Sequence, residues 1–396
     1  MGRFVVLRCA SLFSYEIDDP QLALDEVLSQ LNEEIELLDN TVGIIMCNPE
    51  FIETGTLEYL CEHLPFEVAG VTTSCQAVNG EVGELVLTIF VMTSDDVQFR
   101  TGLTESVIEE TGKPTAAAFE AATAGQDTMP KLALIFPPRI VEIAGDVHIH
   151  EAERVIPGVP IFGAMATDDT VTFESSAAIF NGRHYKDRMP FILCYGEINP
   201  RFLIGTFPED KAMPYKGEVT SASGSYVREI NNINAYQYFE EIGFAANGAR
   251  AEKYLFVPFL IDLKTREDSD GVPVTRTLAS FTEEGTAIFR GYVDEGSTFS
   301  LLTGEPEDVM AITQMRVEEA VAVPDINGLL LFPCIVRQMI TMQINPLREL
   351  EIARDIIPPN IPFMMGYAAG EICPTSVRNG VPANRFHNYS LVILAV

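Results

Sequence analysis

The feature that most constrains the fold is a pattern of strand, helix and strand that recurs three times along the chain. Each copy begins with a compact apolar run that ends in a polar or proline turn, and each continues through a segment typical of a helix. A proline and apolar residues then precede a glycine that is followed by small residues. The opening runs are 42–49, 132–138 and 329–334, and the glycine segments are 65–73, 160–166 and 362–370.

This order predicts a βαβ-like unit in each copy, because parallel strands need a crossover connection between them. A glycine after the second strand lets backbone come close to a ligand or to another turn, since no Cβ stands in the way. Each unit is followed by another apolar run, at 84–91, 191–195 and 390–396. We therefore predict a strand–helix–strand–strand module used at least three times. Ordinary α/β connections that coincide by chance are the alternative.

The other periodic segments indicate a mixed α and β protein. Pro20 precedes apolar residues at three- and four-residue steps over 21–38, which predicts an amphipathic helix, and a second helix is expected over 235–244. Antiparallel strands are predicted at 254–263, 273–281, 286–293 and 298–303, with turns at 268–271 and 294–296. We predict an α+β fold of two domains, 1–218 and 219–396, with mixed sheets flanked by helices in a layered αββα arrangement.

Acidic residues greatly outnumber basic ones. Lys and Arg number 26 against 57 Asp and Glu, so the formal net charge is −31 at pH 7. Such a field repels phosphate backbones and anionic lipid headgroups. We therefore expect no nucleic-acid partner.

The cysteines and the apolar runs bear on the compartment. Seven cysteines, with no Cys-x-x-Cys pair among them, argue against a disulfide framework and against a thiolate zinc site. The apolar stretch 329–344 is interrupted by Pro333, Arg337 and Gln338, so we expect no membrane span. A reduced, cytoplasmic location is expected.

Few motifs point to catalysis or to a metal. The sequence contains neither a P-loop nor a Gly-x-Gly-x-x-Gly segment after a strand. His148 and His150 would face the same side of a strand, where Asp146 would add a third candidate metal ligand. A solvated strand edge or a helix start is the alternative for these two histidines.

Polar residues near the C-terminus form the main candidate site. Cys334 begins a predicted helix close to Arg337, and such a cysteine can be a nucleophile. Arg337 can instead bind a carboxylate in bidentate fashion, while Glu371 binds an ammonium group. The pair suits an amino acid or a similar zwitterion; alternatively, the two side chains pair with each other. His387 lies among polar neighbours that would fix its tautomer.

Several segments resemble a known family. They are 70–73, 160–169, 219–224, 230–231, 235–236, 334–337, 366–372 and 386–388. On these segments the chain resembles the FIST family of bacterial and archaeal signalling proteins over nearly its whole length. The resemblance implies a sensory protein for a small ligand such as an amino acid, and some members are haem proteins that sense nitric oxide. Family domains are often joined to, or encoded with, kinases, chemotaxis receptors or cyclic-dinucleotide enzymes.

The leading hypothesis is therefore a cytoplasmic sensor, not an enzyme, that binds a small polar metabolite. No output domain is recognisable in the sequence, so we expect a separate signalling partner. The predicted ligand-binding residues are Cys334, Arg337, Gly366, Tyr367, Gly370, Glu371, His387 and Asn388.

Two further hypotheses remain open. In one the ligand is haem, held without covalent attachment by His387 or else by His184, with Arg385 or Arg183 near the propionates. In the other the protein is an enzyme that uses Cys334 as nucleophile and His387 as base.

Overall fold

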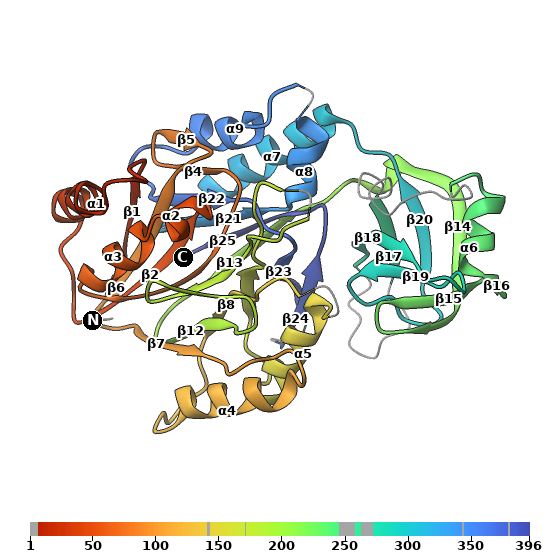
Figure 1. Ribbon diagram of the computed structural model, residues 1–396, viewed down its shortest axis with the longest axis horizontal. Helices are drawn as coiled ribbons and strands as arrows, with labels where there is room; N and C mark the ends of the chain where they lie inside the picture. The colour runs from red at the N-terminus through yellow and green to blue at the C-terminus, as the bar shows by residue number, and fades with distance from the viewer. Residues whose placement is uncertain are drawn as a thin grey trace.

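The structure is a computed structural model that describes residues 7–140, 143–170, 172–244, 258–262, 272–342, 344–378 and 381–396. Its helices and strands form two bodies, a larger core and a lobe that the chain builds between residues 212 and 302 (Figure 1). The core sheets mix parallel and antiparallel strand pairs. The predicted α+β class is confirmed.

Three six-stranded sheets make up the core in the described part of the chain. The first has the order β1 (Leu7–Ser14), β6 (Leu87–Ser94), β2 (Asn40–Cys47), β3 (Glu67–Thr72), β10 (Ala178–Phe180), β11 (Arg183–Tyr185). The second has β7 (Gln98–Leu103), β12 (Pro190–Tyr195), β8 (Leu132–Ile135), β9 (Ile161–Ala164), β23 (Glu371–Arg378), β24 (Val381–His387). The third has β13 (Arg201–Gly205), β25 (Leu391–Ala395), β21 (Leu329–Pro333), β22 (Phe363–Gly366), β4 (Gln76–Val78), β5 (Glu81–Gly83).

The sheets surround one shared apolar core and carry helices on their outer faces. Ile44 of β2 and Leu134 of β8 point into this core, whereas the next residues, Ile45 and Ile135, pack beneath helices. Both faces are buried, which explains the near-continuous apolar runs. The helices are α1 (Pro20–Glu34), α2 (Glu50–Glu53) and α3 (Thr56–His63) by the first sheet, α4 (Gly112–Thr123) and α5 (Gly145–Val155) by the second, and α7 (Pro306–Val321), α8 (Ile335–Thr341) and α9 (Arg348–Ile356) by the third (Figure 1). Across any two sheets the layers follow the predicted αββα order.

The three predicted modules are confirmed, and each gives a hairpin to the sheet of another. Hairpin β4–β5 pairs with β22, β10–β11 with β3, and β23–β24 with β9. The exchange closes a ring, so the modules form one unit. Corresponding backbone bonds run from Thr73 N to Cys47 O, from Ala166 N to Pro137 O and from Ala368 N to Pro333 O, at 2.9, 3.0 and 2.9 Å. The predicted division at residue 218 falls within a strand of the lobe, and as a domain boundary it stays a prediction.

The lobe is a closed antiparallel barrel with a helix packed against its interior. A 3₁₀ turn, Glu209–Lys211, leads into the strands β14 (Ala212–Ser223), β20 (Thr298–Leu302), β17 (Pro258–Asp262), β18 (Val274–Phe281), β19 (Ala287–Arg290) and β15 (Tyr226–Ile230), and β15 pairs back onto β14. Strand β16 (Ile233–Asn234) extends β15, and α6 (Ala235–Glu241) places the buried Phe239 in the barrel core. These elements confirm the strands predicted at 273–281, 286–293 and 298–303. The run 254–263 is described only over 258–262, and the turn 268–271 lies outside the described residues.

Candidate functional site

Arg337, a predicted ligand-binding residue, is fully buried and bonded within the core. Its guanidinium lies 2.8 Å from the Glu349 carboxylate and donates to Thr313 Oγ1 at 2.9 Å. Two further bonds, each 3.2 Å, reach the carbonyl oxygens of Val309 and Tyr389. Arg337 therefore ties α7, α8 and α9 to the loop before β25, and it pairs with Glu349 rather than with Glu371.

Cys334, Glu371 and Tyr367 are buried close to this network. Burial, followed by the nearby charge of Glu371, raises the pKa of the Cys334 thiol well above its ordinary value. Burial likewise raises the pKa of Glu371, whose Oε2 accepts from Ser390 N at 3.3 Å. The Tyr367 hydroxyl donates to Glu349 Oε2 at 3.2 Å. The environment thus favours the neutral thiol and the neutral carboxylic acid.

The other predicted site residues lie where the third module meets its neighbours. Gly366 and Gly370 leave no room for a Cβ, which would press on Met46 or overlap the ring of Phe386. Asn388 Oδ1 accepts from Thr277 N of the lobe at 3.3 Å. As contacts to a ligand, the eight predicted residues stay a prediction.

The histidines proposed for haem do not fit that group. His387 is 3% exposed. Its Nε2 lies 3.0 Å from the carbonyl oxygen of Cys373, and burial lowers its pKa to about 4. His184 is an exposed residue of the short edge strand β11, and the open groove that it lines with Leu57 and Glu58 would leave a haem largely exposed to solvent. His148 and His150 lie on helix α5 rather than on a strand, and within the described residues no group of three metal-ligating side chains is found.

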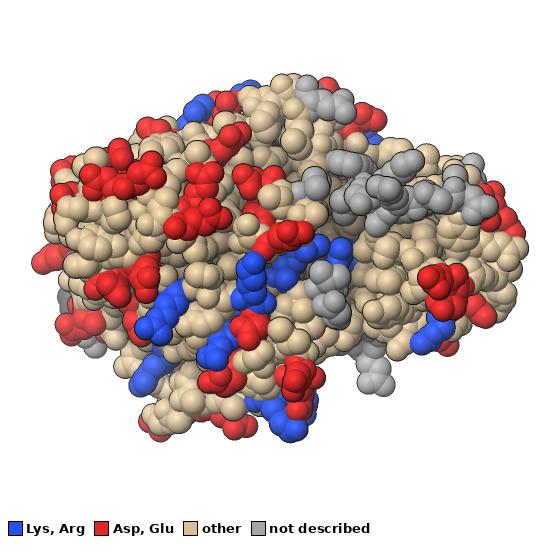
Figure 2. Space-filling view, in the orientation of Figure 1, with Lys and Arg blue, Asp and Glu red and all other residues tan. Residues whose placement is uncertain are grey.

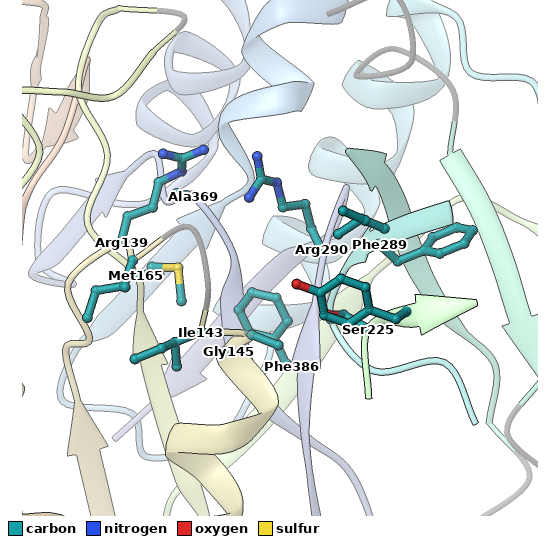
Figure 3. Close-up of a pocket in the computed structure, with 14 residues that line it drawn as sticks. Arg139, Ile143, Gly145, Met165, Ser225, Phe289, Arg290, Ala369 and Phe386 are labelled. Carbon is teal, nitrogen blue, oxygen red and sulfur yellow. The ribbon is translucent and has the colours of Figure 1, made fainter. Parts of the chain in front are cut away.

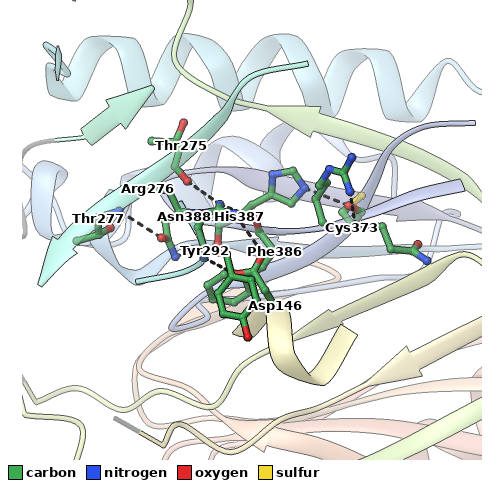
Figure 4. A network of polar contacts seen from close by, with 11 residues as sticks. Asp146, Thr275, Arg276, Thr277, Tyr292, Cys373, Phe386, His387 and Asn388 are labelled. Atoms are coloured by element: carbon green, nitrogen blue, oxygen red, sulfur yellow. Dashed lines mark hydrogen bonds and ion pairs between the residues drawn. The ribbon is translucent and has the colours of Figure 1, made fainter. Parts of the chain in front are cut away.

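A buried charge pair joins the core to the lobe. Arg276 of β18 lies 3.3 Å from Asp146 of α5, and it donates to the carbonyl oxygens of Phe386 and Tyr292 at 2.7 and 3.1 Å (Figure 4). The second oxygen of Asp146 accepts from Tyr292 N at 2.8 Å. Asp146 thus contacts two residues of the lobe. A Cβ at Gly145 would overlap Phe386, so glycine lets the start of α5 approach this junction.

A cleft opens beside the junction, with walls from both bodies. It encloses about 490 Å³, including the part that is open to solvent. Arg139, from the loop after β8, and Arg290, at the end of β19, reach toward the same space from opposite sides (Figure 3). The other lining residues are Ile140, Ile143, Ala144, Gly145, Met165, Ser225, Tyr226, Ile288, Phe289, Gly291, Ala369 and Phe386.

The two arginines give the cleft a positive charge. Burial lowers the pKa of Arg139 to about 10, and the like charge of Arg290 is the next largest cause. The charge of Asp168 raises that pKa. Arg139 also stacks 4.5 Å from the centre of the Phe173 ring. The side chain of Arg290 makes no hydrogen bond or ion pair with any residue that the structure describes, and burial lowers its pKa. Such an arrangement attracts an anion. Figure 2 shows several Lys and Arg side chains gathered near the middle of the face in view, beside the lobe.

Sequence reasoning missed both arginines of the cleft. Arg139 directly follows the run 132–138, and Arg290 lies within a predicted strand, 286–293. Neither belongs to a motif, and they are far apart in the chain. The available signal was indirect: basic residues are scarce in this chain, and Arg139 follows two prolines at the end of a module strand.

Two models of known protein domains match this chain, and between them they include residues of both walls of the cleft. The FIST N domain matches residues 41–233, and the FIST C domain matches residues 233–374. The chain belongs to the FIST family. FIST domains are sensory domains of signal transduction, which gives the protein its general role. No curated protein matches the chain.

The division between the two FIST matches falls inside the lobe. The FIST N match ends at β16 and the FIST C match begins there, so the barrel is built from both. Arg139 belongs to the FIST N segment and Arg290 to the FIST C segment. The cleft therefore joins the two parts of the family sequence. In the part of the chain that the structure describes, no helix is both long and apolar enough to cross a membrane.

Proposed function

We propose that this FIST protein is a cytoplasmic sensor that binds a small polar metabolite, such as an amino acid or an organic acid, between the core and the lobe. The observation that carries the proposal is the approach of Arg139 and Arg290 across a cleft lined by both bodies. A few polar groups in a mostly apolar recess are typical of small-molecule sites. The sensory role of FIST domains supports the same conclusion.

Binding between two bodies provides a means of signalling. A ligand changes an equilibrium only when it binds one arrangement more tightly than the other. A ligand that contacts Arg139 and Arg290 together favours the arrangement in which both can reach it. A separate kinase, chemotaxis receptor or cyclic-dinucleotide enzyme would then respond to the position of the lobe.

Binding rather than catalysis is proposed on the character of the side chains. No histidine, cysteine or carboxylate is among the described residues that line the cleft. Cys334, the candidate nucleophile, is 2% exposed, and its raised pKa keeps it a thiol at neutral pH. A nucleophilic cysteine instead needs a readily formed thiolate.

Tryptophan fluorescence tests this proposal directly. The chain has no Trp, so Tyr226→Trp at the cleft provides a single emission signal. We expect an amino acid or an organic acid from a screen to change this emission saturably and to bind the unmodified protein in calorimetry. Arg290→Ala should weaken that binding by at least tenfold, because a charge-assisted contact is lost. Arg201→Ala, which removes the same charge at an exposed site of β13, should not.

Either of two results would contradict the proposal. One is the absence of saturable binding by any compound of the screen. The other is binding that neither Arg139→Ala nor Arg290→Ala weakens, since the ligand would then occupy another place.

A further inference from the structure

We infer that the ligand of the cleft is an organic acid whose carboxylate binds Arg139 and Arg290 together and whose apolar body packs against the wall that contains Ile143 and Phe386. The inference rests on the proposed function and narrows the ligand to one chemical class. It follows from the charge of the cleft, from its apolar lining and from the lack of a described partner for an ammonium group.

Two positive charges lie on opposite walls of the cleft. Arg139 and Arg290 bring two guanidinium groups of the same sign close together in a chain whose formal net charge is −31. Guanidinium groups bind a carboxylate through paired hydrogen bonds, and a carboxylate has two oxygens to share between them. An anion in this position turns a repulsion between the core and the lobe into two attractions.

Apolar side chains line much of the remaining wall of the cleft. Ile143, Met165 and Phe386 lie beneath the two guanidinium groups in Figure 3, and Ile288 of the lobe also lines the cleft. Water held against such a surface is readily displaced by hydrocarbon. An inorganic anion would leave this wall uncovered, whereas an organic acid covers it.

An amino acid would also bring an ammonium group into the cleft. No Asp or Glu is among the described lining residues. The nearby Asp168 accepts from Thr170 N at 2.7 Å and from Ser175 N at 2.8 Å. Asp146 is likewise engaged, with Arg276 and Tyr292. Among the residues that the structure describes, an ammonium group would therefore face two arginines and no carboxylate that lines the cleft, so the geometry favours an acid that lacks it.

The test uses compounds that differ in one property at a time. Hexanoate and phenylacetate serve as organic acids, hexanamide and phenylacetamide as their uncharged counterparts, phenylalanine as a zwitterion, and inorganic phosphate as an anion without an apolar body. Binding is followed through Tyr226→Trp emission and by calorimetry on the unmodified protein. We expect at least one acid to bind at least tenfold more tightly than its amide, than phenylalanine and than phosphate. Arg139→Gln and Arg290→Gln should each remove that preference, and Arg201→Gln should retain it.

The outcomes separate this inference from the proposed function. If phenylalanine or an amide binds in the cleft as tightly as the acids, the carboxylate class is wrong while the sensor site stands. If phosphate binds as tightly as the acids, the apolar wall plays no part and the inference also fails. If none of these compounds binds, the inference is overturned, and a wider screen that also finds no ligand overturns the proposed function with it.

Discussion

Removing the charge of Asp146 tests the account of the junction between core and lobe. The side chains of Arg276 and Asp146 are 0% and 4% exposed, so water does not screen the pair. In Asp146→Asn the side chain keeps its size, but the buried Arg276 loses the charge of the Asp146 carboxylate. Breaking a buried pair by removing one partner costs about 3–5 kcal/mol. We expect Asp146→Asn to lower the free energy of unfolding by that amount.

A second substitution separates the buried charge from the loss of shape. In the double variant Asp146→Asn/Arg276→Met both charges of the pair are removed, so we expect recovery of at least about 1 kcal/mol of the loss. Recovery is incomplete, because the carbonyl oxygens of Phe386 and Tyr292 lose their donor, at about 1–3 kcal/mol each if they stay unsatisfied. The measurement is urea unfolding followed by circular dichroism, with the slope compared among the variants.

An exposed ion pair provides the control. Lys113 and Glu110 lie 2.8 Å apart with side chains 82% and 52% exposed, so Lys113→Met should leave the unfolding curve unchanged. A loss below about 1 kcal/mol in Asp146→Asn would refute the reasoning, because the loss of this buried carboxylate from Arg276 would then be nearly free of cost. A double variant less stable than the single one would refute it as well.

Further predictions concern buried titrating groups and close backbone contacts. Burial raises the pKa of Glu371 above its ordinary 4.5, so the folded state holds a proton there that the unfolded chain loses, and stability falls as pH rises above that value. Glu371→Gln should reduce this dependence of the melting temperature on pH between pH 5 and 8. An unchanged dependence would contradict the prediction. Burial lowers the pKa of His387 from 6.5 to about 4, so stability is lost as pH falls through that interval. In urea unfolding, His387→Gln should remove up to about 3 kcal/mol of this loss of stability at low pH. An equal loss in the variant would argue against a buried neutral ring. Gly163→Ala should destabilise the protein by several kcal/mol in urea, since a Cβ there overlaps the backbone oxygen of Ile135, and a neutral result would show that this strand pair relaxes freely. Native Cys334 should react with iodoacetamide no faster than a model thiol at pH 7, and faster labelling would favour the enzyme hypothesis.

The modules could be predicted because their strands are buried on both faces. A run such as 132–138 is apolar throughout, since alternate residues face the shared core and the outer helices. The glycine signal has a physical basis at Gly70 and Gly163, where a Cβ would overlap backbone of the neighbouring strand. In the third module the corresponding position is Met365, so the glycine of the pattern, Gly366, lies one residue later.

Other features depend on contacts between distant residues. The helix predicted over 21–38 ends at Glu34, because Ile35 becomes extended on the way to β2. Which sheet receives a hairpin depends on an edge elsewhere in the chain, as when β4 joins β22. The polar residues Arg337 and Glu371 stand out in an apolar sequence, but that pattern is the same for a ligand contact and for a buried structural bond. The ion pair between Arg337 and Glu349 of α9 holds the Arg337 side chain within the core.

The closed exchange of hairpins also bears on where this protein can change shape. Each module of the core is hydrogen bonded into another, so no module can move without breaking a strand pair. The lobe is instead joined to the core by the short connections 206–211 and 303–305, which lie close together, since Lys211 is 2.8 Å from Asp308 at the start of α7. Movement of the lobe about these connections would have to break the Arg276–Asp146 pair, and it would open or close the space between Arg139 and Arg290. A ligand in the cleft is therefore placed where it can change the relation between the two bodies, which is what a sensor requires.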